Sequence, residues 1–248
     1  MEAWELALAA AGSFVAGYAG SMLGLVLGTL RLPLLVWLAG SPLAAAGTNI
    51  AISAASAAAG SARHARAGRV DWRLVAWMAP PSVLGAVLGA LLADDVSERL
   101  LQALIAIVLL WSGADLAFRP VHPLARDRLR LWPAVVGGFG IGALGGAIGV
   151  ILGTLRMPTL VRGVGMDVRR AAGTNLVVGF LLGVAGFAAH TGALGVDWEL
   201  LAAGLAGALP GGWLGAKATG RFDENVLRIA LGVVLALVGV AFAVQAAS

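Results

Sequence analysis

The sequence predicts an all-α polytopic membrane protein built from two inverted-topology repeats, each with about five membrane crossings. One crossing in each repeat is expected to be a short segment that is broken or re-entrant. Three observations support this prediction: the composition of the chain, its long apolar runs, and an internal repeat whose two copies differ in charge.

The composition indicates an integral membrane protein with little soluble mass. Of the 248 residues, 60% are hydrophobic and 12% are charged, whereas a soluble domain carries about twice that share of charge. A spanning helix needs ~20 apolar residues, and six runs approach or exceed this length: 43–62, 74–93, 100–118, 171–189, 200–218 and 226–244. The net charge of +4 comes from arginines between these runs, so it bears on topology and not on nucleic acid.

The first element in the chain is expected to be a membrane span that is retained in the mature protein. The stretch "MEAWELALAAAGSF" at 1–14 begins with acidic residues. A signal peptide needs a basic region at that place, so this stretch does not fit one.

The second element is a short glycine-rich and proline-containing segment that occurs twice. Residues 27–33 read "LGTLRLP" and residues 152–158 read "LGTLRMP". The match continues with "AAGTN" at 45–49 and 171–175, and with "VDW" at 70–72 and 196–198. Such self-similarity indicates duplication. It divides the chain into repeat 1 at 1–122 and repeat 2 at 123–248, within one integral membrane domain.

The loops of the two halves differ in charge. Residues 62–73 hold four arginines and one aspartate, whereas the matching loop at 190–198 holds no lysine or arginine. The loop at 163–170 is basic and matches an uncharged one near Ser41. Cytoplasmic loops collect lysine and arginine, so matching loops are expected on opposite sides, as in inverted repeats. We expect 62–73 and 163–170 to be cytoplasmic, and 190–198 and both termini to be external.

Inversion requires an odd number of crossings in each half. Hydropathy finds about four long segments per half, about eight helices in all, so the fifth crossing must be the short segment at 24–40 and at 149–165. At ~1.5 Å per helical residue, such a segment reaches about 25 Å. The alternative is eight full spans with re-entrant short segments, in which case the charge swap is partly accidental.

Arg31 and Arg156 are the leading candidates for a functional site. Arginine at membrane depth costs about 2.5–3.5 kcal/mol on insertion scales, and neither short segment contains a carboxylate. One arginine could simply extend to the headgroups. Two at matching positions of inverted halves are expected to face one water-accessible central cavity and to bind an anion there.

The residues around these arginines extend the candidate site. The two "GTN" segments at 47–49 and 173–175 precede long apolar runs, so they are expected to cap helix N-termini, which favour anions. They are expected to face each other, the alternative being ordinary caps. The full set of candidate substrate-binding residues is Gly28, Thr29, Arg31, Thr48, Asn49, Gly153, Thr154, Arg156, Thr174 and Asn175.

These paired motifs resemble the TauE/SafE sulfite exporter family over nearly the whole chain. The resemblance implies a permease for sulfite, organosulfonates or related sulfur-containing anions in the inner membrane of a bacterium or archaeon. It points to two sets of residues: Gly28, Pro33, Gly47, Thr48 and Asn49, and Gly153, Pro158, Gly173, Thr174 and Asn175. The arginines depart from the family pattern, in which that place is usually apolar or small.

The sequence therefore predicts a secondary transporter of a small sulfur-containing anion, with its site between the repeats. The alternative is an anion channel or an accessory subunit of a larger complex. An enzyme is not expected, and neither is a cofactor, because the chain has no cysteine and its three histidines are scattered, without a metal cluster. His64 and His190 are more often structural at such positions than proton-coupling. The expected partners are the anion and the lipid bilayer, with a homodimer left open and no nucleic acid.

Overall fold

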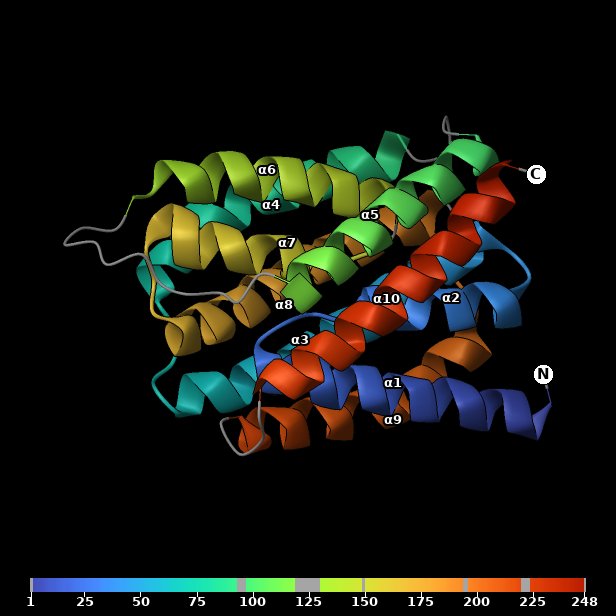
Figure 1. Cartoon of the computed structure of the whole chain (residues 1–248), viewed down its shortest axis with the longest axis horizontal. Coiled ribbons are helices and arrows are strands. Elements are labelled where there is room, and N and C mark those ends of the chain that lie inside the picture. Colours follow the sequence, from blue (N-terminus) through green and yellow to red (C-terminus); the bar gives the residue numbers. More distant parts are fainter. Residues whose placement is uncertain are drawn as a thin grey trace.

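The described residues fold into helices (Figure 1). The computed structural model describes residues 2–92, 97–118, 130–148, 150–193, 196–219 and 224–247. Ten α-helices lie in these ranges. The predicted all-α class is confirmed.

The first half of the chain contains five helices: α1 (Ala3–Leu23), α2 (Gly28–Ala39), α3 (Pro42–Arg66), α4 (Trp72–Leu92) and α5 (Glu98–Phe118). The second half follows the same order: α6 (Trp132–Ala147), α7 (Gly153–Pro158), which continues into the π-helical turn η2 (Thr159–Val164), α8 (Val168–Ala193), α9 (Trp198–Ala218) and α10 (Glu224–Ala247). Four described helices, α1, α3, α4 and α8, are clearly long and apolar enough to cross a membrane. The shorter apolar helices include α2 and α6.

An unwound linker precedes each short helix, as the glycines in the sequence predict. Gly24 ends α1 in the left-handed region with φ 71°, and the amide of Leu25 donates to the carbonyl of Gly20 at 2.7 Å. The next helix begins only at Gly28. In the second half, the amide of Val150 donates to the carbonyl of Gly145 at 2.8 Å, and α7 begins at Gly153. Gly149 lies outside the described residues.

The helices pack in pairs that connect the two halves of the chain. In Figure 1, α1 lies along α9, α4 along α6, and α5 along α10. Helices α3 and α8 pack on each other, α3 against α9 and α8 against α4. Glycines make the first two contacts close. A Cβ at Gly89 would overlap the carbonyl oxygen of Ala143, and one at Gly215 would overlap that of Tyr18. Small residues allow such backbone approach inside membranes.

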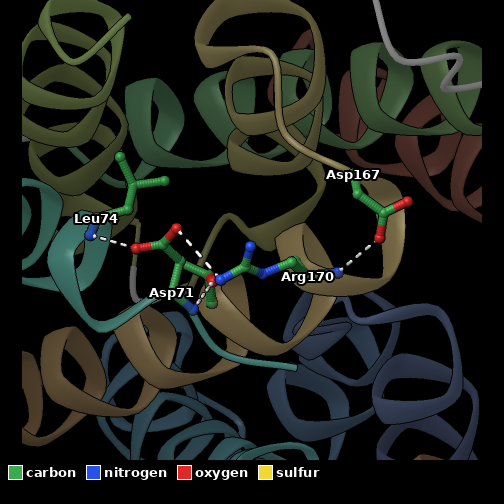
Figure 2. Close-up of polar contacts among 5 residues, drawn as sticks. Asp71, Leu74, Asp167 and Arg170 are labelled. Carbon is green, nitrogen blue, oxygen red and sulfur yellow. Dashed lines mark hydrogen bonds and ion pairs between the residues drawn. The ribbon is translucent and has the colours of Figure 1, made fainter. Parts of the chain in front are cut away.

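The structure places the start of α1 and the end of α10 at the same end of the molecule (Figure 1). At the other end, the loop after α3 contacts the start of α8. The Asp71 amide donates to Thr174 Oγ1 at 3.0 Å, and Arg170 Nη2 lies 3.7 Å from Asp71 Oδ2, as Figure 2 shows. The two loops predicted to be cytoplasmic therefore lie side by side.

The prediction that the "GTN" segments cap helix N-termini is wrong. Ser41 caps α3, accepting from the amide of Ala44, with Pro42 in the first turn. Asp167 caps α8, accepting from the amide of Arg169 and from the amide of Arg170, the second contact being drawn in Figure 2. Serine and aspartate are strong caps and proline fits the first turn, so both helices start more than one turn before the "GTN" segments.

Candidate functional site

The linkers before α2 and α7 cross at the centre of the fold. Asn175 Nδ2 donates to the carbonyl of Gly24 at 2.9 Å and to the carbonyl of Gly153 at 3.1 Å. A Cβ at Gly153 would lie 2.6 Å from the amide nitrogen of Val26. Val26 and Ile151 belong to one buried apolar cluster. One asparagine therefore joins the linker before α2 to the start of α7, two segments that are far apart in the sequence.

Arg31 lies in the first turn of α2 and is 3% exposed. Its Nη2 donates to three acceptors on α3: the Asn49 carbonyl at 3.1 Å, Asn49 Oδ1 at 2.9 Å and Ser53 Oγ at 2.7 Å. Its Nε has no hydrogen-bond partner among the described residues. One terminal nitrogen of this guanidinium is thus fully engaged with the helix beside it.

Arg156 lies in α7 and is fully buried. Its Nε donates to Asn175 Oδ1 at 2.8 Å. Within the described part of the chain, neither Nη1 nor Nη2 has a hydrogen-bond partner. Since both hydrogens of the Asn175 amide point at backbone carbonyls, its oxygen must face the arginine, which fixes the orientation of the guanidinium.

The two guanidiniums are buried cations without a described acidic partner. The ion pair just before α4 joins Asp71 to Arg170, and neither Arg31 nor Arg156 pairs with a carboxylate among the described residues. A buried charge is costly unless it is paired and hydrogen-bonded. The unpartnered N–H groups have the geometry and charge to bind an oxyanion.

The structure does not place the two arginines in the predicted water-accessible cavity. Their exposed fractions are 3% and 0%, and each donates to the long helix of its own half. The linkers and the apolar side chains of Val26 and Ile151 fill the space at the crossing. The two arginines are therefore shielded from solvent in this structure.

The two threonines of the "GTN" segments do not face each other. Thr48 Oγ1 accepts from the Asp197 amide and Thr174 Oγ1 from the Asp71 amide, both at 3.0 Å. Ile50 of α3 packs against Gly186 of α8. Because Ala54 lies at Gly183, the two helices run in opposite directions, so Thr48 lies beyond the level of Gly186. Its distance from Thr174 along α8 is therefore more than 12 residues, or about 18 Å at 1.5 Å per residue. Each threonine holds the start of a helix from the other half.

The remaining candidates lie at the arginines. A Cβ at Gly28 would overlap Ser53 Oγ, and one at Gly153 would lie 3.3 Å from Asn175 Nδ2. Both glycines therefore let a polar side chain of the long helix approach the short one. Thr29 and Thr154 are buried in the same turns, and Thr29 Oγ1 has no hydrogen-bond partner in the described residues.

Sequence reasoning missed two positions, Ser53 and Gly179. Ser53 binds Arg31, and a Cβ at Gly179 would lie 3.0 Å from Arg156 Nη2. Each follows an asparagine of the "GTN" segments by four residues. Residues four apart share a helix face, so this spacing could have identified both.

His64 has a structural contact. It is 1% exposed, and its Nε2 lies 3.3 Å from the carbonyl oxygen of Ser21 at the end of α1. The side chain of His190 lies outside the described residues. In the described part of the chain, no group of three or more His, Asp or Glu side chains could hold a metal ion.

Comparison with known proteins assigns the chain to a family. The family model described as "Sulfite exporter TauE/SafE" matches residues 9–242. The chain belongs to the TauE/SafE family. It is therefore a multi-pass membrane transporter and not an enzyme.

Two curated relatives of this TauE/SafE protein carry compatible names. A "Probable membrane transporter protein" of Xylella fastidiosa (strain 9a5c) is 28% identical over 241 residues, which cover 90% of each chain. The "Probable membrane transporter protein YdhB" of Bacillus subtilis (strain 168) is 26% identical over 201 residues, or 79% of this chain and 82% of the relative. No solved structure matches this chain.

Proposed function

We propose that this TauE/SafE protein is a secondary transporter that moves a small sulfur-containing anion, such as sulfite or an organosulfonate, across the cytoplasmic membrane. The observation that carries the proposal is the pair of buried arginines, Arg31 and Arg156, without an acidic partner among the described residues. The name of the matching family model supports the substrate class.

Charge balance explains why an anion suits this site. A cation held in an apolar interior is stabilised strongly by a hydrogen-bonded anion. Guanidinium offers planar parallel donors that match two oxygens of an oxyanion. Sulfite and sulfonates each present three oxygens on one sulfur, so they can accept from such a donor pair.

The proposal places the site between two inverted repeats, 1–122 and 123–248. Each half makes the equivalent contact to the other half: Thr48 accepts from the Asp197 amide, and Thr174 accepts from the Asp71 amide. The packing of α1 on α9 likewise matches that of α6 on α4. In inverted-repeat transporters the site lies at the repeat interface near the midplane, and one part moves against the other to alternate access. Such a movement would open this closed site to one side at a time.

Counterflow in liposomes tests the transport proposal. Purified protein is reconstituted alone into vesicles loaded with unlabelled sulfite, and uptake of trace radiolabelled sulfite is followed. A transporter is expected to give transient, saturable accumulation above equilibrium, because exchange is coupled to the internal pool. Flux that does not saturate would indicate a channel. Absence of flux with every sulfur anion tried would contradict the proposal.

The orientation of the repeats gives a second expected result. The loop containing Ala67 carries the arginines that cytoplasmic loops collect, so Ala67→Cys should react with a membrane-impermeant thiol reagent only from the cytoplasm. Glu2→Cys and Glu199→Cys should react from outside. Acidic residues contribute little to orientation, and the chain has no cysteine of its own, so the background is clean. Labelling of Ala67→Cys from outside alone would refute this orientation.

A further inference from the structure

The two arginines differ in how many donors they leave free. Arg156 uses Nε alone and keeps Nη1 and Nη2 without described partners. Arg31 commits Nη2 to three acceptors and leaves Nε free. Both terminal nitrogens, the pair that suits two oxygens of one anion, are therefore without a described partner on Arg156, whereas Nη2 of that pair is engaged on Arg31.

One residue on each long helix accounts for this difference. Ser53 lies four residues after Asn49 on α3, and its hydroxyl accepts from Arg31 Nη2 at 2.7 Å. The residue four after Asn175 on α8 is Gly179, which has no side chain to accept from Arg156 Nη2. A Cβ there would lie only 3.0 Å from that nitrogen and 2.9 Å from Val26 Cγ2. Glycine thus keeps the terminal nitrogens of Arg156 unblocked.

We infer that Arg156 makes the main contact with the transported anion through Nη1 and Nη2, and that Gly179 is a specificity-determining residue because it keeps these donors free. The inference rests on the proposed function, since it concerns the same site. The ligand class is an oxyanion with at least two oxygens on one atom, such as sulfite or a sulfonate. A halide is a single atom, so it cannot offer a separate acceptor to each of the two nitrogens. Arg31 contributes positive charge and holds α2 against α3.

The test compares sulfite binding to purified full-length variants by thermal shift and by titration calorimetry. Arg156→Lys keeps the charge but lacks the planar donor pair, so its affinity for sulfite should fall by about 10-fold or more. Arg31→Lys should lose clearly less affinity for sulfite than Arg156→Lys. Gly179→Ser should also lose about 10-fold, because its side chain occupies the place of an anion oxygen beside Nη2. Gly140→Ser is the matched control, since Gly140 is exposed on α6 with no atom within 4 Å of a Cβ.

The outcomes separate this inference from the proposed function. If Arg31→Lys loses as much affinity as Arg156→Lys, or if Gly179→Ser binds sulfite normally, the inference is overturned and the anion site itself stands. If neither lysine variant changes binding, the site fails as a whole. Should Gly179→Ser not yield folded protein, the two lysine variants, which keep the charge, decide the question. Chloride, tested as a competitor, should not displace sulfite at equal concentration.

Discussion

The double variant Arg31→Ala/Arg156→Ala is expected to lose anion transport completely while the protein still folds. A charge-assisted hydrogen bond from Arg156 to the bound anion is worth roughly 1.5–3 kcal/mol, and Arg31 adds positive charge to the site. Removing Arg156 alone should therefore cost about 10- to 100-fold in affinity. Folding should survive because each side chain is a buried cation without a described acidic partner, and removing an unpaired buried charge relieves its desolvation cost. Sulfite counterflow and the thermal unfolding midpoint in detergent measure the two effects separately.

A matched control removes two arginines of equal charge from the surface. Arg73 and Arg169 are both exposed, so Arg73→Ala/Arg169→Ala should keep near-normal counterflow. A purely structural role for the buried pair predicts the opposite pattern for Arg31→Ala/Arg156→Ala: a lower unfolding midpoint with intact affinity. If that variant carries sulfite with near-normal affinity, the buried arginines do not form the substrate site.

The fold class and the broken segments could be predicted from the sequence because they depend on local chemistry. Long apolar runs require helices in lipid, where every backbone polar group must be paired. Gly24 ends α1 and Gly28 begins α2, and a left-handed glycine at a helix end is a common local pattern. The duplicated "GTLR" motif identified the arginines without a structure, since a charge in an apolar run is informative by itself.

The partners of these side chains could not be predicted in the same way. Thr48 and Thr174 look like helix caps, yet each accepts from an amide of the other half, a contact that exists only once the halves are packed. The burial of the two arginines could not be predicted either. The sequence shows that Arg31 and Arg156 lie in apolar segments, but only the packed helices and linkers bury their side chains.

Replacing Gly24 by alanine is expected to destabilise the protein strongly, although it adds only one methyl group. Gly24 has φ 71°, and this left-handed backbone costs an L-residue roughly 1–2 kcal/mol. The added Cβ would also overlap Ala172 of α8, and overpacking typically adds about 1–3 kcal/mol. The yield of folded protein in membranes and the thermal unfolding midpoint should both fall sharply. Anion affinity should fall too, because the Gly24 carbonyl helps to hold Asn175, which orients Arg156.

Gly68→Ala separates backbone strain from the crossing of the linkers. Gly68 has nearly the same backbone angle, φ 68°, but no atom lies within 4 Å of a Cβ built there. This variant should lose only the roughly 1–2 kcal/mol of the left-handed conformation and keep full sulfite affinity. The difference between the two variants then measures how tightly the linker before α2 packs against α8. Equal losses in Gly24→Ala and Gly68→Ala would mean that this contact is loose, and that the orientation of Arg156 does not depend on it.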